Sequence, residues 1–457
     1  MSHSFSALPH ELLCHVLEHA GGLRTLYAAS RVCRTWRAAA EEQRRSLPSL
    51  RLLSSHGCSS GKIRFPHAMS LLPRHVGASG STDDVGALDN LIICEQGCPG
   101  ARLPHIRIVS VPASAPPTSS CSTEQHTATP TSAAVPTPSS SSTTLHTIAP
   151  LIKDLPLVRR GSSGPSGLAV HAPSSGSPVS LFVSDHGLDT ITESTLSSLS
   201  SHRRGRVVGG FGTDPGCLIG PCDLCIADDY LFIAEARGIS AFDVNTLACS
   251  HKWGTVGRGD GEFKSVAGLA AKAGELYACD TGNCRIQVFG TSDGRFLRAF
   301  GKKGDAPGQF RKPVAVIVVG GMAAAGSATT VSAGQELTRV IVAESIGRRV
   351  QVLGYSGAPL QLISSLAAPL QTPAQLVSDE EEGEEEEEEA EAFAAPVNRQ
   401  EACSGHWRGW AHRGDRPSAR IGCFAVDEAR GRLYAMGATG NACLHIFELL
   451  PTRVPKM

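Results

Sequence analysis

The sequence predicts a mainly β protein, in which a short N-terminal helical segment is followed by a β-propeller of six blades with disordered insertions. Three observations predict this fold class. Apolar residues recur at helical spacing near the N-terminus. Further along, a phrase of two apolar residues, a small residue and an acid returns about every 45 to 50 residues, and each copy is followed by a turn and a second alternating stretch. Long runs rich in Ser, Thr, Pro or Glu interrupt this repeat.

The first element, over residues 8–37, reads as two or three short helices with more apolar residues than so small a unit can bury. Leu8-Pro9 places a proline near a helix start, where its missing N–H costs little. The Gly21-Gly22 pair separates the first helix from the next. The apolar positions are Leu8, Leu12, Leu13, Val16, Leu17, Leu23, Leu26, Tyr27, Val32, Cys33 and Trp36. A unit of about 40 residues usually needs a metal, disulfides or a partner, so we expect it to complete its core on another protein.

The order Leu-Pro, Glu-Leu-Leu, Val-Leu, Val-Cys-Arg and Trp-Arg within this segment resembles an F-box. Members of that family dock on a small Skp-type adaptor, which links them to a cullin ubiquitin ligase. The resemblance implies an adaptor-binding domain over residues 4–48. It also implies that the adaptor contacts are made by Leu8, Pro9, Leu12, Leu13, Val16, Leu17, Val32, Cys33 and Trp36. The alternative is a helical hairpin that caps the following domain.

Composition bounds the class of protein. The 457 residues are 41% hydrophobic, which allows a sizeable core. The N-terminus lacks the basic and apolar regions of a signal peptide, and no apolar run reaches the roughly 18 residues of a membrane span. We therefore expect a soluble intracellular protein of the cytoplasm or nucleus, without a membrane partner. Its 15 cysteines should be reduced thiols, and the single CxxC at Cys222 and Cys225 predicts no metal site.

The repeated phrase defines the blades of the propeller, which we expect over residues 52–450. Two strands joined by a Gly- or Asn-containing turn make a hairpin, and here the first strand of each hairpin ends on an acid, or on glycine in the last copy. These end residues are Glu95, Asp185, Glu235, Asp280, Glu344 and Gly437. Six hairpins predict six blades. We expect a strand near one terminus to close the ring, with Leu444 to Phe447 as a candidate.

The clearest repeat, from Gly257 to Gly301, resembles an NHL repeat, and six is the usual blade number in that family. Its Asp280 and Arg285 flank a tight turn, and Glu344 and Arg349 echo them. A catalytic function would require such pairs to converge on one pocket. Because active sites are rarely copied from blade to blade, we interpret the repeated polar residues as hairpin ties. They are Asp185, Glu235, Asp280, Arg285, Glu344 and Arg349.

Two segments interrupt the ring. Residues 112–150 are dominated by Ser, Thr, Pro and Ala, and residues 367–396 contain a run of eleven acids between Asp379 and Glu391 without a basic residue. Such compositions cannot bury a core, so both are predicted to be disordered loops. The whole chain has 42 basic and 43 acidic residues. Because eleven of the acids lie in the acidic run, the rest of the chain has a mildly positive net charge.

These features predict a non-enzyme: the substrate-recognition subunit of an SCF-type cullin E3 ubiquitin ligase. Its partners would be a Skp-type adaptor, a cullin and an unidentified protein substrate on the propeller. No catalytic residue, cofactor site or metal site is predicted. A propeller hydrolase or lyase would need convergent metal ligands, and the histidines occupy no regular repeat position.

The alternative function is an RNA-binding NHL propeller that recruits turnover machinery. It requires basic residues to gather on one face of the propeller. The residues that decide between the two functions are Arg237, Arg258, Arg285, Lys302, Lys303, Arg348 and Arg349.

Overall fold

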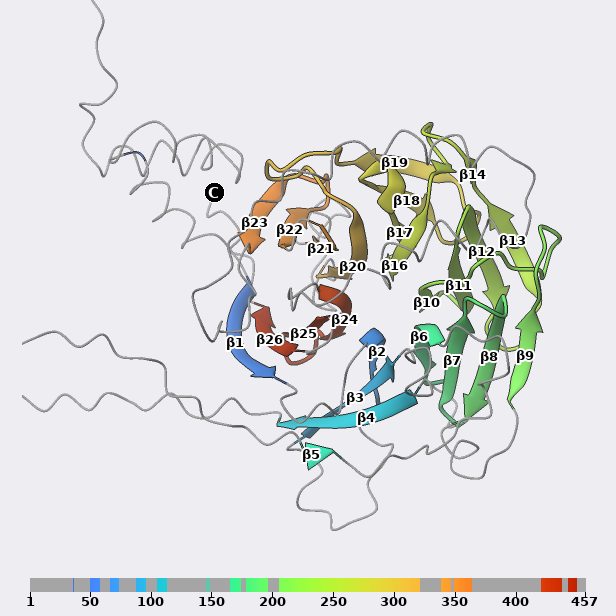
Figure 1. The fold of residues 1–457 in the computed structure, drawn as a ribbon, viewed down its shortest axis with the longest axis horizontal. Coiled ribbons are helices and arrows are strands. Elements are labelled where there is room, and N and C mark those ends of the chain that lie inside the picture. Colours follow the sequence, from blue (N-terminus) through green and yellow to red (C-terminus); the bar gives the residue numbers. More distant parts are fainter. Residues whose placement is uncertain are drawn as a thin grey trace, which may run out of the picture.

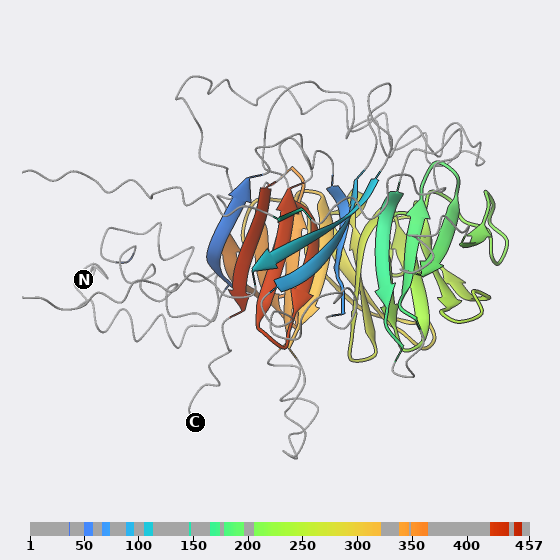
Figure 2. The same cartoon turned by 90° about the horizontal axis from the view of Figure 1, so that it is seen from below.

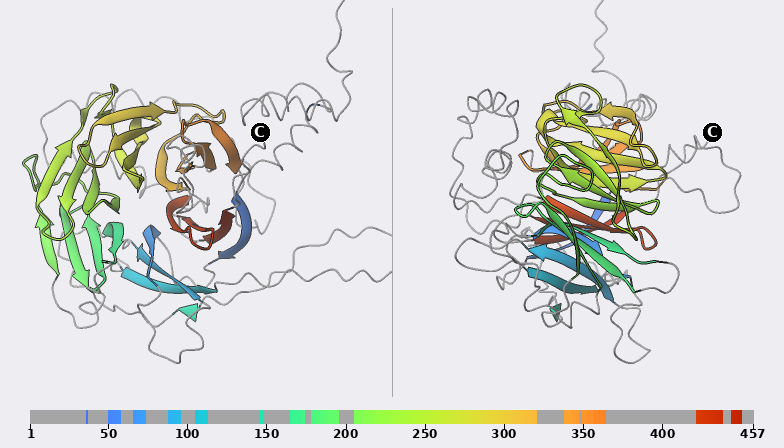
Figure 3. Two further views of the ribbon diagram at one scale, coloured as in Figure 1. Left: turned by 180° about the vertical axis from the view of Figure 1, so that it is seen from behind. Right: turned by 90° about the vertical axis from the view of Figure 1, so that its right-hand side faces the viewer.

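Six four-stranded antiparallel sheets stand around a common axis like the blades of a propeller (Figure 1). The computed structural model describes residues 36, 50–57, 66–73, 88–95, 105–112, 146–147, 165–173, 178–195, 205–320, 338–346, 349–363, 421–437 and 443–449. The view from behind shows the same ring of sheets (Figure 3). The mainly β class and the six blades predicted from the sequence are confirmed. Among the described residues, no helix has the length and apolar character that crossing a membrane requires.

The first three blades follow one another along the chain. Blade 1 consists of β2 (Pro66–Leu71), β3 (Leu88–Glu95), β4 (His105–Pro112) and β5 (His146–Thr147). Blade 2 consists of β6 (Pro165–His171), β7 (Ser180–Asp185), β8 (Thr190–Thr195) and β9 (Arg206–Gly209). Blade 3 consists of β10 (Leu224–Ala227), β11 (Tyr230–Glu235), β12 (Gly238–Asp243) and β13 (Cys249–Trp253).

The other three blades complete the ring. Blade 4 consists of β16 (Val266–Lys272), β17 (Glu275–Asp280), β18 (Arg285–Gly290) and β19 (Phe296–Phe300). Blade 5 consists of β20 (Pro313–Val319), β21 (Arg339–Glu344), β22 (Val350–Gly354) and β23 (Pro359–Ile363). Blade 6 consists of β24 (Ile421–Asp427), β25 (Arg432–Gly437), β26 (Cys443–Leu449) and β1 (Leu50–Gly57). The short strands β14 (Thr255–Val256) and β15 (Glu262–Phe263) pair in parallel between blades 3 and 4.

The repeated acid-ended phrase forms the second strand of every blade. Its six end residues are the last residues of β3, β7, β11, β17, β21 and β25. The two predicted insertions lie almost entirely outside the described residues. Within residues 112–150, however, β5 supplies the fourth strand of blade 1 by pairing with Val109 and Ser110, so the prediction of a strand-free loop is wrong at His146–Thr147.

The antiparallel order gives the ring two different faces. In blades 1 to 5 the strand nearest the axis comes first in sequence, and each following strand reverses direction; blade 6 has the same alternation from β24 outward to β1. The hairpins after the second strands and the connections from one blade to the next therefore leave on one face, which we call the loop face. The remaining hairpins leave on the opposite face, which we call the turn face. Figure 2 shows the sheets between these two faces.

The ring is closed by β1, which precedes all the other strands in sequence and pairs antiparallel with β26. The predicted closing residues, Leu444 to Phe447, belong instead to β26, the strand that receives β1. Gln361 of blade 5 fixes the first residue of β1, because its side-chain amide accepts from Leu50 N at 2.8 Å and donates to Leu50 O at 3.2 Å. Blade 6 is thus assembled from two ends of the described chain.

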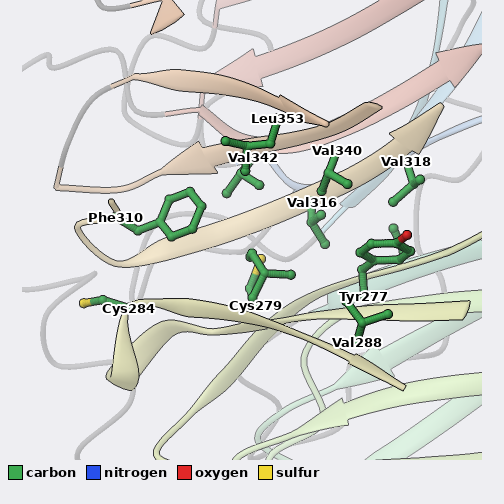
Figure 4. Close-up of a cluster of buried hydrophobic side chains, with 12 residues drawn as sticks. Tyr277, Cys279, Cys284, Val288, Phe310, Val316, Val318, Val340, Val342 and Leu353 are labelled. Atoms are coloured by element: carbon green, nitrogen blue, oxygen red, sulfur yellow. The ribbon is translucent and has the colours of Figure 1, made fainter. Parts of the chain in front are cut away.

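Apolar side chains fill the spaces between neighbouring blades. Between blades 4 and 5, Tyr277 and Val288 face Val316 and Val342, and Phe310 closes the layer from the connection between these blades (Figure 4). Burying each such side chain contributes about 1.5–3 kcal/mol relative to leaving it exposed. Because every blade has such a layer on both sides, no blade holds a core of its own.

Polar ties on the turn face join blades that are far apart in sequence. Asp89 of blade 1 accepts the Tyr434 hydroxyl at 2.5 Å and Arg430 Nη1 at 2.7 Å, both from blade 6. Burial, and then the Asp89 carboxylate, raise the pKa of the Tyr434 hydroxyl, so it stays a donor. These bonds support the same closure that β1 makes on the outside of the ring.

The closing strand offers a matched test. Leu50 is 5% exposed and packs in the layer between blades 5 and 6, whereas Leu52 on the same strand is 48% exposed. We expect Leu50→Ala to lower the free energy of unfolding by about 2–4 kcal/mol and Leu52→Ala to lower it by less than about 0.5 kcal/mol. Urea unfolding measures both, and equal losses would contradict closure through this strand.

Candidate functional site

The predicted adaptor-binding residues lie outside the described residues, with the exception of Trp36. Trp36 is helical and half-buried. The positions of the others stay a prediction; they are Leu8, Pro9, Leu12, Leu13, Val16, Leu17, Val32 and Cys33. The site that can be described is the loop face of the propeller, where the repeated acids and arginines lie.

Asp280 is the centre of a polar cluster at the end of β17. Its Oδ1 accepts Lys264 N at 3.2 Å, and its Oδ2 accepts Arg285 Nε and Asn283 Nδ2, both at 2.9 Å, and Gln287 Nε2 at 3.2 Å. The carboxylate is fully buried, which requires this degree of hydrogen bonding. It therefore fastens both the hairpin and the connection that enters blade 4.

Arg285 and Gln287 extend this cluster to the connection between blades 3 and 4. Arg285 Nη2 donates to Gly259 O at 2.6 Å and to Glu262 O at 2.9 Å. Gln287 Nε2 donates to Glu262 O at 2.7 Å, and its Oε1 accepts Gly261 N at 3.0 Å. The side chains of one hairpin thus make hydrogen bonds to backbone N–H and C=O groups of a loop, and most of these groups have no partner in a sheet.

Blade 5 repeats the arrangement with Glu344. Its Oε2 accepts Arg311 N at 2.6 Å, and its Oε1 accepts Arg349 Nε and Gln351 Nε2, both at 2.7 Å. Arg349 donates on to the backbone oxygens of Gly304, Asp305 and Gln309, and Gln351 Oε1 accepts Gly308 N at 2.8 Å. The second copy therefore holds the connection from blade 4 to blade 5 in the same way.

Blades 3 and 2 use other donors. Glu235 accepts Ile219 N at 2.8 Å and Lys252 Nζ at 3.1 Å on Oε2, and the Ser240 hydroxyl on Oε1. Lys252, from the fourth strand, takes the place of the arginine. Asp185 accepts from Gly187 N and Leu188 N of its own turn. The connection entering blade 3 is held by Glu235 through Ile219 and also by Asp189 of blade 2, which accepts Gly220 N at 2.8 Å.

The loops that these clusters hold have a shared glycine pattern. Gly254 and Gly301 open them with φ of +103° and +94°, and a Cβ at either position would meet the ring of Phe263 or Phe310. Both phenylalanines are fully buried between blades. The Asp280 and Glu344 clusters fix the backbone of each loop. Exposed side chains on these loops, such as Arg258, Lys302 and Lys303, can therefore be substituted without loss of those hydrogen bonds.

The sequence alone missed Gln287, Gln351 and the closing residues Asp89 and Tyr434. The two glutamines had a signal, because both stand two residues after the arginine of the hairpin, in Arg-Ile-Gln-Val and Arg-Val-Gln-Val. Asp89 and Tyr434 had none, since they lie 345 residues apart and belong to different blades.

Asp223 is a fifth residue that the sequence alone did not indicate. It lies at the start of β10, next to the axis, where the other inner strands have small residues: Ala68, Gly167, Gly268, Ala315 and Cys423. Its Oδ2 accepts Leu269 N of the neighbouring inner strand at 2.9 Å, and its Oδ1 accepts Leu224 N at 2.9 Å. Burial raises the pKa of this carboxyl to about 6.

The described residues contain no cluster of His, Cys, Asp or Glu suited to a metal ion. The thiols of Cys222 and Cys225 flank Asp223, and burial raises the pKa of each to about 12. Because the thiolate is the reactive form of cysteine, neither thiol is suited to nucleophilic chemistry. The carboxylates of blades 2 to 5 are also occupied, since each accepts two or more hydrogen bonds; they are Asp185, Glu235, Asp280 and Glu344.

Most basic residues that decide between a protein and an RNA ligand lie on the loop face, but they are not equivalent. Arg285 and Arg349 are buried in the clusters above, with side chains 14% and 7% exposed. Arg258, Lys302 and Lys303 are exposed on the two connections, and Arg237 is half-buried in the hairpin of blade 3. Arg348 lies outside the described residues. Arg311 and Lys312, which the sequence analysis did not include, add exposed positive charge beside Lys302.

The buried and exposed ion pairs of blade 5 allow a direct comparison. Glu344→Gln leaves Arg349 buried without its counter-charge, which should lower the free energy of unfolding by about 3 kcal/mol. Asp305→Asn removes the partner of Arg311 from a pair whose side chains are 66% and 48% exposed, and this should cost less than about 1 kcal/mol. Urea unfolding of both variants measures the difference, and a cost for Glu344→Gln as small as for Asp305→Asn would contradict a structural role of the cluster.

Asp223 predicts a particular pH dependence. Its pKa of about 6 in the folded protein exceeds its ordinary value of 3.8, so the folded state retains a proton that the unfolded chain loses between these values. The free energy of unfolding should therefore fall as the pH rises from about 4 to about 6. Asp223→Asn should be more stable than the natural protein at pH 7.5, by about 1–2 kcal/mol after allowance for solvent, and equal to it at pH 3.5.

Thermal unfolding across this pH range checks the prediction, with Asp214→Asn as the control at an exposed carboxylate. A gain in Asp223→Asn that is the same at pH 3.5 and pH 7.5 would show that ionisation of Asp223 is not its cause.

The comparisons with known proteins concern the two parts of the chain separately. Residues 5–45 match the family model described as F-box-like. No curated protein matches the chain in sequence.

Solved structures similar to the chain include the glutaminyl cyclase of Myxococcus xanthus, at 12% identity and a TM-score of 0.33, over 63% of this chain and 91% of that one. Hydrazine synthase of Kuenenia stuttgartiensis has 15% identity and a TM-score of 0.31, over 45% of this chain and 51% of that one. A gluconolactonase of Xanthomonas campestris has 15% identity and a TM-score of 0.35, over 59% and 68%. These scores are too low for any of the three to assign an activity to this chain.

Proposed function

We propose that this chain is the substrate-recognition subunit of an SCF-type cullin E3 ubiquitin ligase. The observation that carries the proposal is the F-box-like segment at residues 5–45, followed within a few residues by the first strand of a six-bladed propeller. The segment would bind a Skp-type adaptor and, through it, the cullin. The propeller, with blades of NHL type, would bind a protein substrate.

The point where the chain enters the propeller supports this division of labour. Because β1 runs antiparallel to β26, it begins on the turn face, as the outermost strand of blade 6. The polypeptide that follows the F-box-like segment therefore joins the ring at its outer edge, on the face opposite the loops. The loop face of blades 3 to 5 is left available for a substrate.

A receptor of this kind makes and breaks no covalent bond. It raises the local concentration of the substrate beside the charged conjugating enzyme, and that proximity is its contribution to the rate. The structure supports a non-catalytic role in one respect: the carboxylates of blades 3 to 5 each accept several hydrogen bonds that fasten loops. Substrate specificity would then reside in the exposed side chains of these loops, on a fixed scaffold.

The adaptor contacts in this proposal are Leu8, Pro9, Leu12, Leu13, Val16, Leu17, Val32, Cys33 and Trp36. The hairpin residues Asp185, Glu235, Asp280, Arg285, Glu344 and Arg349 have a structural role. We place the complex in the cytoplasm or nucleus, where cullin ligases work.

An RNA-binding propeller is the second candidate, favoured by the exposed basic residues of the loop face. RNA binding by phosphate contacts would weaken steeply with salt. The burial of Arg285 and Arg349 in ion pairs removes two of the seven basic residues that the RNA hypothesis needs. Filter binding of single-stranded RNA at two salt concentrations separates the candidates, and a flat response excludes the RNA function.

Adaptor binding is tested by affinity purification of Leu12→Asp beside Leu52→Asp. Leu12 lies on the predicted docking face, whereas Leu52 is an exposed leucine of β1 and makes a matched control. Adaptor and cullin should co-purify with the natural protein and with Leu52→Asp, and recovery should fall at least tenfold for Leu12→Asp without a change in propeller melting temperature. Adaptor retained by Leu12→Asp would contradict the proposal.

A further inference from the structure

The connections that enter blades 4 and 5 form a sector of net positive charge on the loop face, which we call the basic sector. It comprises residues 254–264 and 301–312. Its basic side chains are Arg258, Lys264, Lys302, Lys303, Arg311 and Lys312, and its acids are Asp260, Glu262 and Asp305. Positive charges therefore outnumber negative ones by two to one in this sector.

The three acids offset half of the six positive charges, so the sector keeps a net charge of +3. Glu262 Oε2 is held by Gly259 N at 2.7 Å, and Asp305 is paired with Arg311 at 2.7 Å. Within the described part of the chain, no acidic side chain pairs with Arg258, Lys302 or Lys312. The backbone beneath these side chains is fixed by the Asp280 and Glu344 clusters, so the charges stand on a rigid support.

The chain also carries a segment of matching chemistry. Residues 379–391 hold eleven acids and no basic residue. They belong to the connection between β23 and β24, which joins blade 5 to blade 6. By the antiparallel order of the blades, this connection leaves the propeller on the loop face, as residues 254–264 and 301–312 do. The acidic run is therefore tethered to the blade that the second basic connection enters.

The tether is long enough for contact. About 15 residues separate Ile363 from Asp379, which corresponds to an average end-to-end distance of about 20–25 Å for a flexible chain and about 50 Å when fully extended. A tether of this length gives an effective concentration in the millimolar range. At physiological salt, charges within about 8 Å of each other attract with little screening.

We propose that the basic sector docks the chain's own acidic run, residues 379–391, in cis. The contact is electrostatic and reversible, so it responds to salt and to competing acidic ligands. Its consequence is regulatory: an acidic peptide of a partner must displace the run before it can occupy the basic sector. The inference does not depend on adaptor binding, which the N-terminal segment would perform at the opposite face.

The test uses the full chain and a labelled peptide with the sequence of residues 379–391 as the probe. A neutralised variant carries Asp379→Asn and glutamine at each glutamate of the run. Fluorescence anisotropy at low salt should show at least tenfold tighter binding of the probe to the neutralised variant than to the natural protein, because its own run no longer competes. Equal affinities for the probe would overturn the proposal.

Charge reversal then locates the contact. In the neutralised variant, Lys302→Glu with Lys312→Glu should reduce binding of the probe at least tenfold. Arg295→Glu is the matched control, since Arg295 lies in blade 4 on the turn face with a side chain 74% exposed, and it should change binding less than twofold. Equal losses in the two variants would show non-specific attraction and would overturn the docking site.

A zero-length carbodiimide cross-link supplies an independent readout on the natural protein. Peptide mapping should recover links between the run and Lys302, Lys303 or Lys312 at a yield that does not depend on protein concentration. A yield that rises with concentration would place the contact between two chains and would contradict docking in cis. Labelled single-stranded RNA supplies a further comparison. If the natural protein binds this RNA as tightly as the neutralised variant does, the acidic run does not compete for the basic sector, and docking in cis is contradicted. None of these results depends on recovery of an adaptor.

Discussion

The ladder between β1 and β26 is the constraint on which the rest of the structure depends. Without it, blade 6 would have three strands, and the two ends of the described chain would not be joined in one sheet. With it, blade 6 is held to both ends of the described chain while its inner strands pack against blade 1. Gln361 and the Asp89–Tyr434 bond add polar contacts at the same closure. The strand that makes the closure is also the one nearest in sequence to the F-box-like segment, so the fold of the ring and the attachment of that segment meet at Leu50.

The loop face is built so that its frame and its surface are independent. Asp280 and Glu344 each accept hydrogen bonds from their own hairpin and from the connection that enters their blade. A substitution that removes only some of these hydrogen bonds destabilises the fold, because each donor that loses its acceptor is left as a buried polar group without a partner. The exposed side chains between the loop glycines do not take part in these buried hydrogen bonds. They are therefore the positions at which recognition can be set without loss of the fold.

The strands and the blade count could be predicted from the sequence because their causes are local. Alternation of apolar residues and turn residues such as Gly282 and Asn283 mark each hairpin, and the ending acid marks each second strand. Closure could not be assigned, since the hydrogen bonds of Asp89 join residues more than 300 positions apart. Asp223 could not be predicted for a different reason. The Cys-x-x-Cys spacing points to the flanking thiols, whereas the residue that differs from its equivalents in the other five blades is the acid between them. The adaptor face lies outside the described residues, so it rests on the pattern of residues 8–37 and on the family match.

The central claim is that one chain joins an adaptor-binding segment to a closed ring whose loop face the adaptor does not contact. Hydrogen–deuterium exchange of the full protein, with and without a purified Skp-type adaptor, tests it most directly. The account predicts that the adaptor protects amides within residues 5–45 and leaves exchange in residues 254–264 and 301–312 unchanged. Protection of those two connections, or no protection of residues 5–45 at a saturating adaptor concentration, would contradict it.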